Sequence, residues 1–221
     1  MVVILDKCTD KSKEIALQYT NNIHEGSWEI EGERRNFALS KCVGDYVMEV
    51  DADERISREL QEEVLRNIAS GEKVNFKAPI ENYIGKSKLL NTTIRSLIVT
   101  DRQFINFRGS KKYQQDRRLH PVASLQGEVR ALKGKIIHYM DRDFTSFVAR
   151  FNKYTSLRSS DIIDSGKVNK KSTLSLFCSY CNRFIKSYIL KRGYRDGLLG
   201  LVVCLLGCSY NMVSILKSRV K

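Results

Sequence analysis

The stretch YVMEVDADERIS, residues 46–57, places an acidic cluster directly after an apolar run. Residues 46–50 have the character of a short buried strand. Three acids follow within four positions, Asp51, Asp53 and Glu54. Like charges this close repel one another, so they require either a nearby cation or open water. Two interpretations follow: a metal-binding loop, or an acidic loop between two elements.

The segments around this stretch alternate between strand and helix patterns. The predicted strands are residues 2–5, 27–30, 45–50, 74–84, 93–99, 103–108, 122–129 and 136–139. The predicted helices are residues 33–41, 58–70, 173–191, 194–217, one after Asp10 and one after Asp143. Thr9 or Asp10 is the expected N-cap of the first helix, and its inner face would carry Ile15, Ala16, Leu17 and Tyr19. Ser57 is the expected N-cap of the helix at 58–70. Strand–helix alternation with short connections predicts an α/β fold with a partly parallel sheet.

The charge of +13 is confined to the last part of the chain. Residues 1–128 carry 20 Lys or Arg and 20 Asp or Glu, whereas residues 129–221 carry 18 and 5. This asymmetry predicts an anionic partner for the second part. The basic residues flank an apolar segment and no basic motif interleaved with aromatic residues is present, so nucleic acid is not the expected partner. We therefore expect one domain at 1–142 and a helical, basic, membrane-associating region at 143–221, with strong helical spacing from 144 and a polar linker at 159–172.

The segment 197–216 contains no charged residue over 20 positions and is bracketed by Lys and Arg. As a helix it would span roughly 30 Å, the thickness of the hydrocarbon core of a bilayer. Ser209, Asn211 and Ser214 dilute its apolar character. The segment is either a membrane-associated helix, spanning or lying in the interface, or a buried helix packed on the domain. Flanking cations favour an anionic membrane surface, so we expect a peripheral protein, or one with a single C-terminal membrane helix, at the cytoplasmic face of the inner or plasma membrane.

An Asp-x-Asp pair at the end of a buried strand has a definite chemical use. In open α/β sheets, ligands bind outside the carboxyl ends of the strands. Two carboxylates there can share a hard divalent cation that takes its remaining ligands from water and a diphosphate. The cation would act as a Lewis acid when a nucleotide diphosphate departs.

Four longer stretches carry a family resemblance. The segment CTDKSKEIA, followed by GERRNFALSKCVGDYVMEVDADERIS, resembles the family 2 glycosyltransferases, inverting enzymes of the GT-A fold that use nucleotide-diphosphate sugars. Further on, LHPVASLQGEVRALKGKIIHYMDRDFTSFVARFNKYTSLRSSD and KRGYRDGLLGLVVCLLGCSYNMVSILK are similar to the branch that builds lipopolysaccharide cores. The resemblance implies a GT-A-like mixed sheet with flanking helices and a lipopolysaccharide-core or other lipid-linked acceptor.

The resemblance also implies roles for particular carboxylates. Asp53 would bind Mg²⁺ or Mn²⁺ together with the donor diphosphate. Asp51 would lie against the ribose or the water shell of the metal. Asp6, at the end of the first strand, would lie near the base and ribose. Glu54 is interpreted as a structural acid at a helix N-terminus.

Basic residues and a catalytic base are expected around the same pocket. Arg34 and Arg35 either pair with phosphate or form a solvated helix face. An inverting transfer needs a base that takes the proton of the acceptor hydroxyl. The candidate is Asp116 in QQDRRLHP, with His120 as the alternative base or as a substrate-orienting group. His138, in IIHYMDRD, is expected to be a packed or capping histidine.

Family members usually begin with a further strand and helix. Here the first predicted strand corresponds to their second, so roughly 30 to 40 residues have no counterpart. The nucleotide-binding half is therefore expected to be truncated at its N-terminus, with an unpaired sheet edge. Three possibilities stay open: the true start lies upstream, a partner supplies the missing strand, or the chain is an inactive remnant that acts at most as a membrane-bound binding protein.

Overall fold

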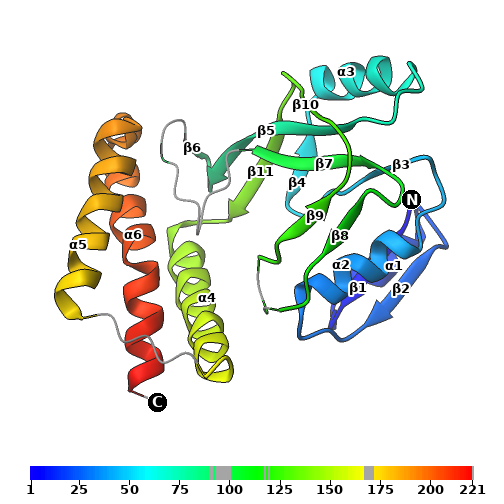
Figure 1. The fold of residues 1–221 in the computed structure, drawn as a ribbon. Coiled ribbons are helices and arrows are strands. Elements are labelled where there is room, and N and C mark those ends of the chain that lie inside the picture. Colours follow the sequence, from blue (N-terminus) through cyan, green and yellow to red (C-terminus); the bar gives the residue numbers. More distant parts are fainter. Residues whose placement is uncertain (90–91, 93–100, 117, 119, 167–171, 221) are drawn as a thin grey trace. The chain divides into compact units, whose positions relative to one another are not determined.

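The computed structural model describes residues 1–89, 92, 101–116, 118, 120–166 and 172–220 (Figure 1). These residues form two compact units. The first unit comprises Met1–Glu49, Glu72–Asn75 and Phe104–Arg130. The second comprises Val50–Gly71, Phe76–Gln103 and Ala131–Lys221. The chain passes between the units three times by way of strands: β5 (Asn75–Ile84), β7 (Asp101–Phe107) and β10 (Val129–Ala131).

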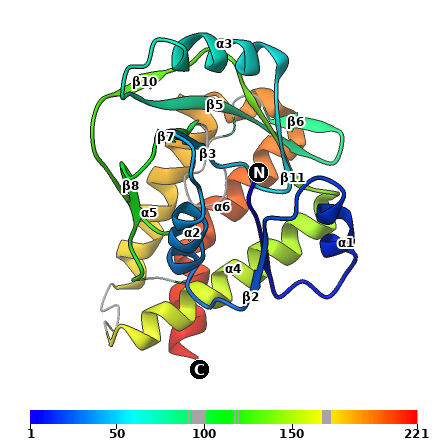
Figure 2. The same cartoon turned by 90° about the vertical axis from the view of Figure 1, so that its right-hand side faces the viewer.

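The first unit contains short strands and two helices. Strand β1 (Val3–Asp6) pairs in parallel with β2 (Ile23–Gly26). Strand β3 (Tyr46–Met48) pairs antiparallel with the end of β7, and β8 (Lys111–Tyr113) pairs antiparallel with β9 (Ala123–Leu125). Helix α1 (Ser12–Leu17) follows β1, and α2 (Glu31–Ser40) packs against β1 and β8 (Figure 2). This arrangement fixes the positions of Asp6, at the end of β1, and of the arginines on α2.

Three predictions for the first unit were wrong. Residues 27–30 do not form a strand; the strand is β2, at 23–26. The reason is Trp28, whose backbone N–H donates to Asp6 Oδ1 (3.1 Å) and whose ring lies 5.5 Å from that of Phe37. The inner face expected for the first helix is also absent, because α1 has only six residues and leaves Ile15 56% exposed. Neither Thr9 nor Asp10 is its N-cap residue, which is Lys11; Asp10 Oδ1 instead accepts from the N–H of Ser12.

The second unit is built on a mixed set of strands. Strand β11 (Ile136–Asp141) lies between β4 (Glu54–Ile56), which is antiparallel to it, and β5, which is parallel. Strand β6 (Ser87–Leu89) forms a hairpin with β5. Helix α3 (Arg58–Ile68) follows β4, and Ser57 caps it by accepting from the N–H of Leu60, as predicted. Leu60 and Val64 are buried on its inner face, but Leu65 is exposed.

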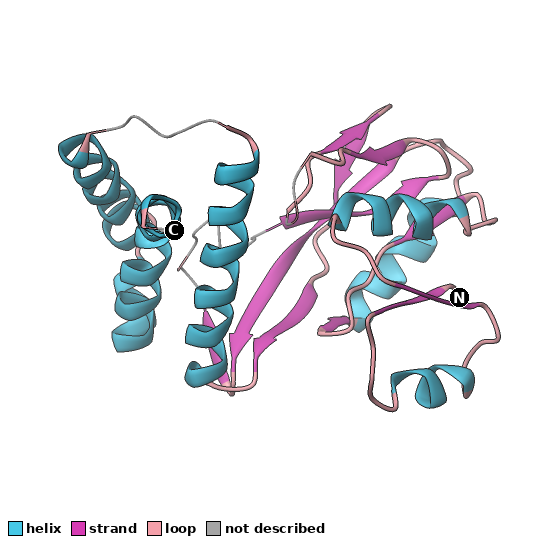
Figure 3. Ribbon diagram, turned by 90° about the horizontal axis from the view of Figure 1, so that it is seen from below, coloured by secondary structure: helices cyan, strands magenta, loops and turns pink. Residues whose placement is uncertain are grey.

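The C-terminal part of the second unit is helical (Figure 3). Helix α4 (Phe144–Asp164) begins at Asp143, whose carboxylate accepts from the N–H of Ser146. Then follow α5 (Thr173–Phe184), a π-helical segment (Ile185–Leu190), a 3₁₀ turn (Gly193–Asp196) and α6 (Gly197–Arg219). Helix α6 contacts both α4 and α5, and Figures 1 and 3 show it between them. The polar linker expected at 159–172 was wrong in its first part, because α4 continues to Asp164.

Helix α6 is the central helix of this group. Val203 and Cys204 are fully buried there, in a core shared with Phe147 and Phe151 of α4. The helical stretch Gly193–Arg219 is long enough to cross a membrane and contains an 18-residue window with a mean hydropathy of 2.0, yet 44% of that window is buried inside the protein. The structure therefore gives α6 a packed core face.

The predicted fold class is confirmed: an α/β protein with a mixed sheet, flanking helices and a helical C-terminal region. The strand predicted at 93–99 lies outside the described residues. The division into 1–142 and 143–221 stays a prediction, since the two compact units group α4, α5 and α6 with β4, β5 and β11.

Candidate active site

The acidic loop that follows β3 closes on itself as a tight turn. The N–H of Glu54 donates to the carbonyl of Asp51 (3.0 Å), and the N–H of Asp51 donates to Glu54 Oε2 (2.9 Å). Glu54 is buried at 4% exposure and begins β4. Its interpretation as a helix N-terminal charge was therefore wrong: Glu54 is structural because its carboxylate bonds the turn. The two aspartates project from this turn with side chains 43% and 49% exposed, Asp51 and Asp53 respectively.

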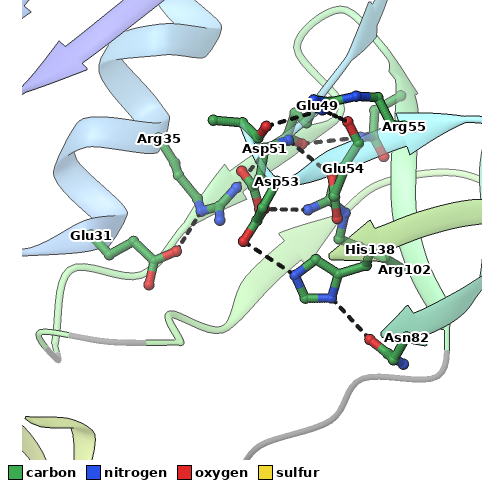
Figure 4. A network of polar contacts seen from close by, with 12 residues as sticks. Glu31, Arg35, Glu49, Asp51, Asp53, Glu54, Arg55, Asn82, Arg102 and His138 are labelled. Atoms are coloured by element: carbon green, nitrogen blue, oxygen red, sulfur yellow. Dashed lines mark hydrogen bonds and ion pairs between the residues drawn. The ribbon is translucent and has the colours of Figure 1, made fainter. Parts of the chain in front are cut away.

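A guanidinium neutralises part of the cluster. Arg102 Nη1 lies 2.7 Å from Asp51 Oδ2, and its Nη2 lies 2.6 Å from Glu54 Oε2. Burial raises the pKa of Glu54 above its ordinary value, whereas Arg102 and the Asp51 N–H act in the opposite direction. The charge of Arg102 thus offsets the repulsion between the carboxylates of Asp51 and Glu54. Asp53 is not part of these two ion pairs (Figure 4).

Asp53 faces a histidine instead. His138 Nε2 lies 3.4 Å from Asp53 Oδ2, and its Nδ1 lies 2.9 Å from Asn82 Oδ1 (Figure 4). Asn82 is buried, and it is the register partner of His138 where β5 and β11 run in parallel. In the neutral ring with Nδ1 as donor to this amide oxygen, Nε2 presents its lone pair to Asp53. His138 also pairs with Glu54, the residue after Asp53, across β4 and β11. Strand register therefore places His138 between Asn82 on one side and Asp53 on the other.

This donor set fits a divalent cation that is only partly enclosed by protein. Within the described residues, no group of three or more His, Cys, Asp or Glu side chains is placed to hold a metal ion alone. Asp53 and His138 provide one carboxylate and one imidazole. Metal-binding histidines characteristically donate their other N–H to an oxygen, and Asn82 Oδ1 lies within hydrogen-bond distance of the second ring nitrogen of His138. Two protein ligands suit a hard cation that keeps waters and binds phosphate oxygens.

In the first unit, Asp6 and Arg34 come together. Arg34 Nη1 lies 3.6 Å from Asp6 Oδ2, and the other oxygen of Asp6 accepts from the N–H of Trp28. Asp6 lies at the end of β1, as the sequence predicts. Arg34 retains 34% exposure of its side chain, so its guanidinium can reach a ligand as well as Asp6.

Arg35 points into a different network. Its Nε donates to Glu31 Oε1 (2.7 Å), its Nη1 lies 3.7 Å from Glu49 Oε2, and its guanidinium lies over the ring of Tyr113. Burial raises the pKa of Glu31, but Arg35 and the N–H of His120 outweigh it, so the pKa lies below its ordinary value. These contacts give Arg35 a structural position that holds α2 to β8.

The two candidate bases lie on the segment between β8 and β9. Asp116 and His120 are both exposed, and the neighbouring Arg117 and Leu119 lie outside the described residues. His120 has a left-handed backbone (φ +54°), and its N–H donates to Glu31 Oε2 (2.9 Å). Glu31 thus contacts both Arg35 and His120, and through this carboxylate the structure brings two predicted site residues together.

Sequence reasoning missed Arg102, Asn82 and the position of His138. Arg102 follows a predicted strand and carries no motif of its own. The one available signal for Asn82 was a polar residue inside a β-branched and aromatic strand pattern at 74–84, which often marks a buried hydrogen bond.

Comparison with known proteins places these residues in a family. The profile described as Glycosyl transferase family 2 matches residues 1–139. An uncharacterized glycosyltransferase of Rickettsia typhi is 25% identical over 210 residues, which cover 91% of this chain and 71% of the relative. A lipopolysaccharide core biosynthesis glycosyltransferase of Rhizobium meliloti is 24% identical over 188 residues, 83% of this chain and 67% of the relative.

Among solved structures, residues 1–349 of TarS from Staphylococcus aureus, in complex with UDP-GlcNAc, align with 99% of this chain and 80% of that chain. The identity is 12% and the TM-score 0.47. The profile match covers more than half of the sequence and includes the acidic turn, Asn82 and His138. The chain belongs to glycosyl transferase family 2 and is a glycosyltransferase.

Proposed function

We propose that this glycosyltransferase moves a sugar, with inversion, from a nucleotide-diphosphate donor to a lipopolysaccharide-core or other lipid-linked acceptor. The observation that carries the proposal is the acidic turn with Asp53 facing His138. The name of the Rhizobium relative supports the choice of acceptor. The apolar helical region with its cations supports a place at the cytoplasmic face of the membrane.

In this proposal Asp53 and His138 hold Mg²⁺ or Mn²⁺. The bound cation would neutralise the charge that develops on the departing diphosphate. Asn82 keeps the Nε2 lone pair of His138 directed at Asp53, and Glu54 keeps the turn closed. Asp51, which pairs with Arg102 through one carboxylate oxygen, is proposed to lie against the ribose or the water shell of the metal.

The remaining groups are assigned by their chemistry. Asp6 and Arg34 form the candidate contact with the nucleotide, in which the carboxylate accepts from a ribose hydroxyl and the guanidinium pairs with phosphate. Asp116 is the proposed base for the acceptor hydroxyl, with His120 as the alternative. Arg35 is proposed to support this segment through Glu31.

Release of nucleoside diphosphate from a panel of nucleotide sugars, with Mn²⁺ present, tests the proposal. The wild-type protein should release the diphosphate from one donor, and Asp53→Ala should reduce the rate by at least about a hundredfold. Asp116→Asn, compared with His120→Gln, identifies the base. Donor binding without release from any donor would favour the alternative, a binding protein that has lost turnover.

A further inference from the structure

The outward side of α5 and of the π-helical segment carries large apolar side chains that the protein does not cover. Their exposed fractions run from 48% to 71%. The residues are Leu174, Phe177, Ile185, Ile189 and Leu190, hereafter the α5 outer face. Positions 174 and 177 are three residues apart and positions 185 and 189 are four apart, while 177 and 185 are separated by eight residues, about two helical turns. Monomeric proteins rarely leave large apolar patches in water.

The opposite side of α5 already has its packing partner. Phe184 and Tyr188 pack against the core cluster that includes Val203 and Cys204 of α6. Tyr180, Phe184 and Tyr188 also stack in a row, with ring centroids 6.4 and 5.1 Å apart. The α5 outer face meets this packed side at Phe177, whose ring stacks on that of Tyr180 with 6.5 Å between the centroids, and its other members lie outside the helical core.

The charged residues around the α5 outer face indicate which partner it would bind. Residues 165–195 contain eight Lys or Arg and no Asp or Glu. Lys186, Lys191, Arg192 and Arg195 are exposed beside or directly after the apolar row. An apolar helix face flanked by cations is the pattern of a helix that lies in a lipid interface. Two copies of the chain placed face to face would instead bring these cations together, with no acidic residue in the segment to pair with them.

We propose that the α5 outer face docks on an anionic phospholipid surface, with α5 parallel to the membrane and Lys191, Arg192 and Arg195 at the headgroups. The inference rests on the proposed membrane association and deepens it by naming the surface. In this arrangement helix α6 does not span the bilayer: it packs between α4 and α5, and α4 carries five charged residues that a spanning arrangement of the packed helices would bring into the bilayer.

Flotation with vesicles tests this surface. Full-length protein is mixed with vesicles of phosphatidylcholine alone, or of phosphatidylcholine with phosphatidylglycerol. Wild type should float with the anionic vesicles, and Phe177→Asp/Ile185→Asp should lower the partition coefficient at least about tenfold. Lys191→Gln and Arg192→Gln should each lower it about fivefold on anionic vesicles alone. The matched control is Leu65→Asp on α3, a side chain with the same 56% exposure as Phe177; it should float like wild type.

Each other outcome has a defined meaning. If wild type and the α5 double variant float equally, the α5 surface is wrong although membrane association stands. If wild type floats with neither vesicle, membrane association itself fails, while donor binding still reports separately on the glycosyltransferase. A wild-type dimer in size-exclusion chromatography that the double variant dissociates, with flotation unchanged, would assign the surface to a second copy and overturn the proposal. Equal thermal unfolding of all variants verifies their folding.

Discussion

Arg102 Nη1 lies 2.7 Å from Asp51 Oδ2, while the other terminal nitrogen of the same guanidinium lies 2.6 Å from the buried carboxylate of Glu54. One cation therefore divides the acidic cluster into a paired half and an open half. The paired half, Asp51 and Glu54, gives the turn its shape. The open half, Asp53, faces His138 and is available to a ligand.

Removal of this guanidinium should destabilise the protein. Arg102→Gln leaves Glu54 buried without its charge partner, and breaking a buried pair in this way costs about 3 kcal/mol. Urea unfolding should show this loss, and Arg102→Gln/Glu54→Gln should recover part of it. The control is Arg58→Gln, whose partner Glu62 is one turn away on an exposed helix face; it should cost at most about 0.5 kcal/mol. An equal loss in the two single variants would contradict the pairing.

Asn82 should control metal affinity through His138. Asn82→Leu removes the acceptor of the Nδ1 proton, so the imidazole is no longer held with its Nε2 lone pair toward Asp53. Mn²⁺ affinity in the presence of UDP should fall about 10-fold to 100-fold. Calorimetric titration measures it, with Asn182→Leu, an exposed position on α5, as control. An unchanged affinity in a folded Asn82→Leu protein would remove His138 from the metal site.

Glu81 should contribute stability that is lost in acid. Hydrogen bonds from Lys88 and Tyr83 lower the pKa of Glu81 from 4.5 to about 2. Because the folded-state pKa is the lower one, this stabilisation is present above about pH 4.5 and disappears as the pH falls toward 2. Glu81→Gln should lose on the order of 1 kcal/mol at neutral pH and show a shallower decline in this window. Thermal unfolding from pH 6 to 2 measures both. Parallel declines would show that Glu81 is not responsible.

Lys217 should anchor the end of α6 to α4. Its ammonium donates to Asn152 Oδ1 (2.7 Å), to Thr155 Oγ1 (2.8 Å) and to Ser156 Oγ (2.9 Å). Lys217→Met should therefore cost about 2 kcal/mol in the free energy of unfolding, because hydrogen bonds to a charged donor are lost. Lys186→Met, at an exposed position, should leave stability within about 0.5 kcal/mol. If the Lys217 variant were as stable as this control, the packing of α6 on α4 would be in doubt.

The parts of the fold that depend on local pattern were predictable from the sequence. Ser57 and Asp143 precede helical spacing and are N-caps in the structure. The parts that failed depend on tertiary packing. Trp28 was predicted to lie in a strand at 27–30, but its ring packs on Phe37 and its backbone N–H donates to Asp6.

The residues of the candidate site also differ in whether a local pattern or a tertiary contact places them. The acidic turn is a local motif and was found, whereas Arg102 and Asn82 reach it only through contacts distant in sequence, 51 and 56 positions from Asp51 and His138. Glu54 was recognised in the sequence as part of the acidic cluster. Its burial and its hydrogen bond to the Asp51 N–H were not predicted, because they follow from the geometry of the turn.

Titration calorimetry of UDP binding, with and without Mn²⁺, tests the central claim most directly. Wild type should bind UDP and Mn²⁺ in a coupled manner, each raising the affinity for the other. Asp53→Ala should abolish the coupling, while Asp45→Ala, an exposed aspartate before β3, should retain it. UDP binding that does not depend on the metal, and that Asp53→Ala leaves unchanged, would contradict the assignment of Asp53 as the metal ligand.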